Sequence, residues 1–337
     1  MSEPTPQFIR NAELAQSDFL DLGNSGLTAL PKEVVKLSSH LKKLNLGSYY
    51  IDDSGKNWAE TVNKQAKNEL TNLHFVKKLH YLHELYLCEG VISNIKSQNN
   101  KHFYKNFKSK HEISNLDLST LKHLKILVLN ADRITNLIIK DLPHIQILIL
   151  GAKQLSNICI EQLPQLNTLF ISASEIHKID LKAFPALKEL YIYTDALTNA
   201  QIEQLPLLYE FYLEAIKITN LQMKMLSSLD YIELKGEAFT NIHFTHLPKL
   251  RDLILEAEKI VNVTSQGIAP GAKVQMMSTR QSNIHFTTSP INLSEGKEVF
   301  GKQPEKAIEP TYIEENFHKK ANANPIEIRI NLSPNFA

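Results

Sequence analysis

The sequence predicts a strand-rich solenoid, in which stacked coils of 21 residues each add one short strand to a parallel sheet. The 337 residues include 47 leucines and 33 isoleucines but 10 valines, and this excess of two residue types indicates a repeat. The pattern LxxLxL returns at a constant spacing of 21 residues. A fixed period of this size is typical of a solenoid, because one coil cannot bury its apolar side without neighbours. The first positions of the pattern are Leu124, Ile145, Leu166, Leu187, Leu208, Leu229 and Leu250.

The columns of the repeat describe one coil. Counting the first leucine as position 1, positions 4 and 6 alternate as one face of a short strand does, and strands of successive coils pair about 4.8 Å apart. Position 20 is proline in most coils, which favours extended chain or tight turns on the outer side and few helices. With leucines at positions 1, 4 and 6, the chain resembles the leucine-rich repeat family. The resemblance implies an α/β-type solenoid shaped like a horseshoe, with a parallel β-sheet on its concave face.

Two further columns indicate how each coil turns. Position 8 is small, as at Ala131, Ala173 and Gly236, where the backbone must pass close to its neighbour. Position 13 is asparagine, and we interpret this column as a structural ladder, because an amide both donates and accepts hydrogen bonds. The family usually has its asparagine at position 9, and this departure leaves the subtype open. The asparagines at position 13 are Asn136, Asn157, Asn199, Asn220, Asn241, Asn262 and Asn283.

The N-terminal part predicts a cap followed by less regular coils. Residues 1–18 are expected to form the cap, with a helix in FIRNAELAQSD, and residues 19–291 the solenoid. The segment PKEVVKL predicts a short helix, and an insertion lies at about 47–70. The stretches LDLGNSGLTALPKEVVKL and LNLGSYYIDDSGKNW resemble the N-terminal repeats of bacterial multidomain leucine-rich-repeat proteins, including Roco-type GTPases. The GxxxxGK[ST] phosphate loop of a GTPase does not occur in this sequence.

One coil, at about residues 96–112, keeps its register but loses its strand. Phe103, Asn106 and Lys108 stand where leucines are expected, and an unpaired buried lysine costs several kcal/mol, so this half coil is expected to bulge outward. A decayed coil with a solvated loop is one interpretation. A surface for an acidic partner or nucleic acid is the other. The residues displayed would be Lys96, Lys101, His102, Tyr104, Lys105, Lys108, Lys110 and His111.

After residue 291 the repeat stops. Residues 292–337 begin with a polar segment rich in glycine and proline, which predicts a linker. The later segment IEIRINL alternates Ile326, Ile328, Ile330 and Leu332. We expect it to add a capping strand to the open edge of the last coil, because a bare sheet edge invites aggregation.

Charge and cysteine content narrow the function classes. The chain has 37 basic and 36 acidic residues, so it has no overall field that attracts nucleic acid, for which the segment Lys101 to Lys110 is the one candidate surface. Neither a signal peptide nor a run of eighteen apolar residues is evident, and two distant cysteines fit a reducing compartment. We expect a cytoplasmic, monomeric and bacterial protein without membrane association.

Known catalytic and metal-binding patterns do not occur in the sequence. The pairs His80/His83 and His243/His246 lack the acidic or cysteine company of a zinc site, and the Asp52 turn lacks the other ligands of a calcium loop. A nucleophile elbow, an HExxH motif and a glycine-rich nucleotide turn are also missing. Cys88 has no identified base and is interpreted as an inert thiol. We therefore expect no enzyme, no cofactor and no metal.

The strands themselves provide the candidate binding surface. Positions 3 and 5 alternate with the inward leucines, so they point out of the sheet and are expected to expose an apolar and aromatic stripe with an acidic rim. The alternative is that strands simply favour aromatic and β-branched residues. The rim also includes Glu189, Asp230, Asp252 and Glu256. The expected partner-binding residues are Tyr86, Val128, Ile149, Phe170, Tyr191, Tyr193, Tyr209, Tyr212, Tyr231, Glu210, Glu214 and Glu233.

These observations predict a module that binds a partner protein on the concave surface, the partner bringing an apolar segment with basic residues beside it. A second hypothesis is a regulatory or sensing protein that acts with a GTPase or another switch protein. A third, less favoured, is an enzyme or effector with a site in the insertion or the tail.

Overall fold

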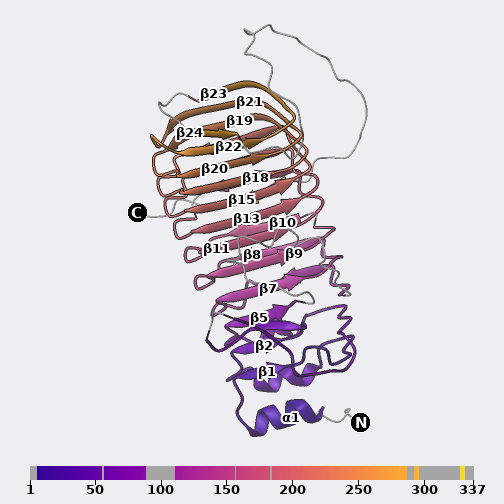
Figure 1. Ribbon diagram of the computed structural model, residues 1–337. Coiled ribbons are helices and arrows are strands. Elements are labelled where there is room, and N and C mark those ends of the chain that lie inside the picture. The colour runs from indigo at the N-terminus through magenta and orange to yellow at the C-terminus, as the bar shows by residue number, and fades with distance from the viewer. Residues whose placement is uncertain are drawn as a thin grey trace.

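The computed structural model describes residues 6–54, 57–88, 111–155, 157–182, 184–286, 292–295 and 327–330. This part of the chain forms a parallel β-solenoid whose coils follow one another every 21 residues (Figure 1). Its helices are α1 (Gln7–Leu14) and the 3-10 helices η1 (Lys32–Leu37) and η2 (Val76–Lys78). The solenoid with 21-residue repeats and few helices, as predicted from the columns, is confirmed. None of the helices described is long and apolar enough to cross a membrane.

The LxxLxL strands form one sheet, here called the first sheet. Between β7 and β20 its register advances by 21 residues at each step, as in Leu148↔Leu169 and Leu169↔Leu190. Its order is β1 (Phe19–Asp21), β2 (Lys43–Asn45), β5 (Glu84–Leu87), β7 (Ile126–Asn130), β9 (Ile147–Gly151), β11 (Thr168–Ser172), β13 (Glu189–Thr194), β15 (Glu210–Ala215), β18 (Tyr231–Lys235), β20 (Asp252–Glu256), β22 (Lys273–Met277) and β24 (Asn292–Glu295).

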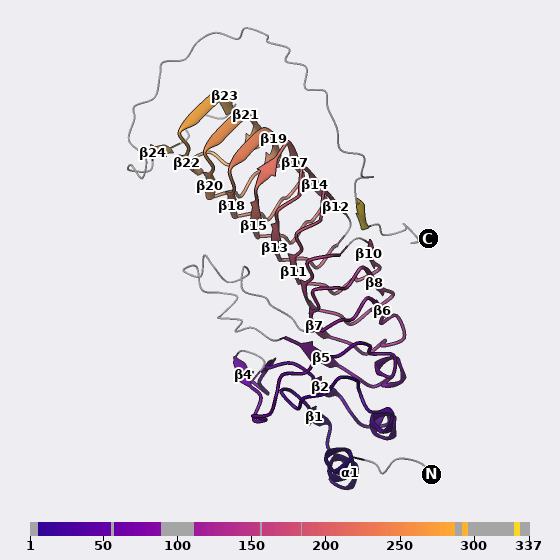
Figure 2. The same ribbon diagram turned by 90° about the vertical axis from the view of Figure 1, so that its right-hand side faces the viewer.

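A second parallel sheet lies on the opposite side of the solenoid (Figure 2). It is built on the apolar alternation of positions 14 and 16, where the sequence indicated extended chain or tight turns. Its strands are β6 (Asn115–Asp117), β8 (Asn136–Lys140), β10 (Asn157–Glu161), β12 (Lys178–Lys182), β14 (Asn199–Glu203), β17 (Asn220–Lys224), β19 (Ala238–Leu247), β21 (Lys259–Ile268) and β23 (Arg280–Phe286), with β16 (Lys217–Ile218) beside β19 and β25 (Glu327–Ile330) between β10 and β12.

The core fills the space between the two sheets. Leu190 and Ile192 from the first sheet and Leu181 from the second are completely buried. Leu197, at position 11, is also completely buried and belongs to the same cluster. Burying a leucine or isoleucine contributes about 1.5–3 kcal/mol, so the repeated columns supply most of the stabilisation.

The asparagine column forms a ladder of side-chain amides. Asn220 donates to Asn199 at 2.8 Å, Asn241 to Asn220 at 3.2 Å, Asn262 to Asn241 at 3.0 Å and Asn283 to Asn262 at 2.9 Å. The ladder therefore joins amide to amide along the surface of the solenoid, rather than bonding buried turn groups as the sequence indicated. Asn241, Asn262 and Asn283 have φ values of 54°, 55° and 54°, in the left-handed region that asparagine tolerates.

The end of the chain departs from expectation. β24 continues the first sheet beside β22. β25, from the segment expected to cap the last coil, pairs instead with β10 and β12 in the interior of the second sheet. The expected position at the open edge is therefore wrong, and the pairing that replaces it is considered below.

Candidate partner-binding surface

The outer face of the first sheet carries positions 3, 5 and 7 of each coil. Position 5 was expected to be exposed, but Tyr86, Val128, Ile149 and Phe170 are only 0, 1, 3 and 1% exposed, and Tyr191 is 7% exposed. The expectation of an exposed stripe is therefore wrong for this part of the column. These side chains form a second apolar cluster, separate from the core between the sheets. Ile126 and Ile147 at position 3 pack against it.

The insertion at about 47–70 covers the N-terminal end of this cluster. It contains an antiparallel hairpin of β3 (Tyr49–Ile51) and β4 (Trp58–Glu60). The rings of Tyr50 and Trp58 each lie 6.5 Å from that of Tyr86, measured between centroids. The Tyr86 hydroxyl donates to Glu84 at 2.7 Å, and burial together with this carboxylate raises the pKa of Tyr86 well above its usual range. Tyr86 therefore belongs to a packed junction, not to an open surface.

A buried lysine holds the hairpin on the sheet. Lys43 donates its ammonium to the carbonyl of Ile51 at 2.6 Å and lies 3.8 Å from a carboxylate oxygen of Glu84. The same nitrogen lies 4.9 Å from the ring centroids of both Phe19 and Tyr50. A cation between two aromatic rings and a carboxylate is well compensated for its burial.

The outer face opens in the C-terminal half, from β13 onward. Tyr193, Tyr212 and Tyr231 are half-buried, and Tyr209 is 39% exposed. Tyr193 stacks between Phe170 and Tyr212, with centroid distances of 5.3 Å and 4.9 Å. Aromatic packing thus continues from the buried cluster to a surface that a partner can reach.

Carboxylates stand among these tyrosines. Glu189 and Glu210 occupy the same register on β13 and β15, and both are half-buried. Tyr209 donates its hydroxyl proton to Glu189, and Tyr231 donates to Glu233 at 2.6 Å. Burial is the main reason why the pKa values of both tyrosines are raised above the usual range, and these hydrogen bonds add to it. The hydroxyls therefore stay protonated and serve as donors at neutral pH.

The acidic rim is partly neutralised further along the sheet. Lys235 forms ion pairs with Glu233 and, at 3.8 Å, with Glu256, and its ammonium lies 5.4 Å from the ring centroid of Tyr212. Asp230 is paired with Arg251 of the next coil, which lowers the pKa of Asp230.

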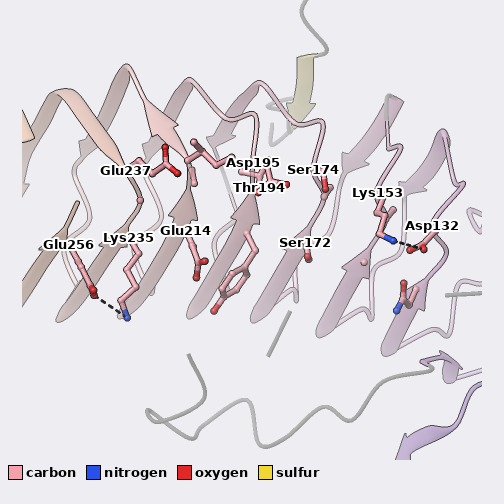
Figure 3. Close-up of a pocket in the computed structure, with 18 residues that line it drawn as sticks. Asp132, Lys153, Ser172, Ser174, Thr194, Asp195, Glu214, Lys235, Glu237 and Glu256 are labelled. Carbon is pink, nitrogen blue, oxygen red and sulfur yellow. Dashed lines mark hydrogen bonds and ion pairs between the residues drawn. The ribbon is translucent and has the colours of Figure 1, made fainter. Parts of the chain in front are cut away.

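A groove follows the carboxyl ends of the first-sheet strands across six coils (Figure 3). Its volume is about 640 Å³. The floor contains the small residues of position 8, Ala152, Ala173, Ala215 and Gly236, between walls made by positions 7 and 9. At Gly236 a Cβ atom would lie 2.1 Å from the carbonyl oxygen of Ala215. The charged lining residues are Asp132, Asp195, Glu214, Glu237 and Glu256, with Lys153 and Lys235.

Sequence reasoning missed this groove, although its signal was present. The small column at position 8 was interpreted only as room for close backbone packing, yet the same small side chains leave a channel between the larger ones beside them. Lys153 closes one end by an ion pair with Asp132 at 3.0 Å. The lining from Asp195 to Glu256 is predominantly acidic, with Lys235 as its one cation.

The basic segment Lys101 to Lys110 lies outside the described residues, as do the other residues expected on that bulge except His111. His111 was expected to be displayed, but it is 1% exposed, and that expectation is wrong. Its Nδ1 accepts a hydrogen bond from the backbone N–H of Leu70 at 3.1 Å, and burial lowers the pKa of His111 to about 4. In the described part of the chain, no group of three or more histidine, cysteine or acidic side chains could hold a metal ion.

Comparisons with known proteins add the fold neighbours but no function. No protein-family model matches the chain, and no curated protein gives a significant match. One similar structure is the leucine-rich-repeat protein LIC12759 of Leptospira interrogans, with 14% identity, a TM-score of 0.23, and coverage of 83% of this chain and 95% of that chain. Another is the functional domain of InlJ from Listeria monocytogenes, which includes a cysteine ladder, with 19% identity, a TM-score of 0.21, and coverage of 78% and 75%.

Proposed function

We propose that the protein is a non-catalytic interaction module that binds a partner protein on the outer face of the first sheet between β13 and β20, together with the adjoining acidic groove. The observation that carries this proposal is the pair Glu189 and Glu210, two carboxylates side by side among tyrosines that remain partly exposed. Like charges in register are unfavourable within one chain, so such a pair favours a basic group supplied from outside.

The surface also has the composition of a protein-binding site. Interfaces are enriched in tyrosine, whose ring gives contact area and whose hydroxyl gives direction. Tyr193, Tyr209, Tyr212 and Tyr231 provide both here. Their hydroxyl protons are directed to neighbouring carboxylates in three of the four cases, which holds the rings in place before binding.

The buried members of the expected site have a different role in this proposal. Val128, Ile149, Phe170 and Tyr191 support the exposed tyrosines from the N-terminal side, and Tyr86 anchors the hairpin. The partner would lay an apolar segment on the tyrosines and place arginine or lysine residues beside Glu189, Glu210 and Glu214. A role beside a GTPase remains a hypothesis that rests on the N-terminal repeats, and nothing in the described surface favours it.

Site-specific photo-crosslinking tests the proposal. The full chain would carry a benzophenone amino acid in place of Tyr212, and peptides crosslinked to it in extracts of the native cell would be sequenced. The matched control carries the same group in place of Gln222, which is also half-buried but lies on β17 of the second sheet. We expect crosslinks to a basic segment of one protein from Tyr212 and not from Gln222.

Two further readings decide the outcome. Replacing Glu189 and Glu210 by glutamine should reduce the crosslink at least tenfold, and raising the salt concentration should weaken it, because the contact is partly electrostatic. Equal crosslinking from Tyr212 and Gln222, or crosslinking unchanged by the two glutamines, would contradict the proposal.

A further inference from the structure

The two sheets differ at one junction between coils. In the first sheet β9 and β11 pair directly, from Ile147↔Thr168 to Gly151↔Ser172. In the second sheet the strands of the same two coils, β10 and β12, do not pair with each other, and β25 lies between them (Figure 2). The neighbouring junctions β8–β10 and β12–β14 are closed. The solenoid is therefore opened by one strand width, about 4.8 Å, on one side of one junction.

An opened junction presents two parallel strand edges. A strand between them finds partners for its backbone N–H and C=O groups on both sides, which is the physical basis of peptide recognition by strand addition. Elsewhere in the described part of this sheet, the neighbouring coils already satisfy each other. The gap between β10 and β12, here called the strand slot, is thus a place where an added strand gains two ladders.

The register in the strand slot matches residue types pair by pair. Along β12 the pairs are Lys178↔Glu327, Ile179↔Ile328, Asp180↔Arg329 and Leu181↔Ile330. Opposite charges thus alternate with apolar pairs, and the acceptor residues Ile179 and Leu181 are completely buried. A shift by one residue would place each charge opposite an apolar residue, so this pattern specifies one register.

The occupying strand is not part of the repeat. β24, the preceding described element, ends at Glu295, six coils away from β12, and 31 residues separate it from β25. Six strand spacings amount to about 29 Å, whereas 31 residues can reach about 100 Å when extended. A tether of this length gives an effective concentration of roughly millimolar, which a partner peptide of good affinity can outcompete.

We propose that the strand slot is a binding site for an extended peptide of a partner protein with the alternation acidic, apolar, basic, apolar, and that residues 327–330 of this chain occupy it as a competing internal ligand. The site lies on the second sheet and is independent of the surface under the proposed function. Partner binding here exchanges one parallel strand for another and leaves the 21-residue core unchanged.

A disulfide tests the occupied state in the full chain. Cys159 on β10 is in register with Arg329, and adjacent parallel strands bring Cα atoms within the range that a disulfide spans. The variant Arg329→Cys should therefore form an intramolecular disulfide under mild oxidation. The same variant with Cys159→Ser should not, and Ile328→Cys, one residue out of register, should crosslink far more slowly. Cys88, the other cysteine, is completely buried.

A peptide then tests the exchange. The probe is a fluorescent peptide of residues 325–332, PIEIRINL, and its binding to the full chain is followed by anisotropy. We expect binding at least tenfold tighter to the variant Ile328→Ser with Ile330→Ser, whose own strand is weakened, than to the unmodified chain. Oxidised Arg329→Cys should not bind the peptide, and a reductant should restore binding.

Charge exchange gives the matched control. The peptide PIRIEINL, with acid and base exchanged, should bind the tail-weakened chain at least tenfold more weakly, and the variant pair Lys178→Glu and Asp180→Lys in that chain should reverse the preference. The proposal is overturned if Arg329→Cys yields no disulfide or one between two chains, if peptide binding is the same in the oxidised and reduced forms, or if both peptides bind alike.

Discussion

Tyr209 donates its hydroxyl proton to Glu189, which lies one coil before it on the outer face of the first sheet. The tyrosine is 39% exposed and the carboxylate half-buried, so this hydrogen bond sits at the boundary between protein and solvent. It arises because the two residues occupy positions 2 and 3 of successive coils. A contact 20 residues apart in sequence thus fixes the direction of a surface tyrosine.

Replacing Tyr209 by phenylalanine should lower the free energy of unfolding by about 0.5–1 kcal/mol, because a hydrogen bond to a carboxylate is lost at a partly exposed site. Chemical denaturation measures this. Tyr81→Phe is the control: Tyr81 is 53% exposed and stacks on His123 with centroids 5.6 Å apart. Equal losses for the two variants would show that the Glu189 bond contributes nothing.

Replacing Phe170 by alanine should lower the free energy of unfolding by about 3–5 kcal/mol, because Phe170 is 1% exposed and its removal leaves a cavity in the outer cluster. Tyr209→Ala, at an exposed position, should cost much less. Thermal and urea unfolding of both variants measure the difference. A small loss for Phe170→Ala would mean that the outer cluster is loosely packed and that position 5 is a surface after all.

His111 should make stability depend on pH. Its folded pKa is about 4 and its unfolded pKa about 6.5, so between these values the unfolded chain binds the proton and the folded chain does not. The contribution is complete above pH 6.5 and is lost as the pH falls to about 4, by up to about 3 kcal/mol. His111→Gln should remove this part of the pH dependence of unfolding. An unchanged profile would place the dependence on other groups.

The asparagine ladder can be tested at Asn241, whose φ is 54°. Asn241→Gly keeps access to this conformation but loses two ladder hydrogen bonds, to Asn220 and from Asn262, and should cost about 1 kcal/mol because the ladder is partly exposed. Asn241→Ala loses the bonds and also strains the backbone, and should cost about 1–2 kcal/mol more. Urea unfolding separates the two contributions. Equal losses would show that the backbone conformation makes no demand on the residue type.

The register and the inner columns could be predicted from single residues. Leu124 and its counterparts every 21 residues face the core as expected, because a period in sequence becomes a stack in space without further information. The short helix in PKEVVKL was also predicted, and it is η1. The asparagine column was recognised as a ladder, although the left-handed φ that explains why asparagine is needed became visible only in the backbone.

The exposure of the outer face could not be predicted. Strand alternation shows that Phe170 and Tyr212 both point away from the core, yet one is 1% exposed and the other half-buried. The difference depends on which other side chains pack on that face, and contacts between segments distant in sequence leave no period. The groove along position 8 depends likewise on side-chain sizes in six coils at once.

The sequence by itself determined the coil, its length, the residues that face the core and the stacking direction, since each follows from a repeated spacing and the cost of exposing leucine to water. The tertiary structure decided what lies on the sheets: the hairpin over Tyr86, the half-open tyrosines beside Glu189 and Glu210, and the strand between β10 and β12. These are single events between distant segments, and their geometry depends on the three-dimensional shape that the repeats create.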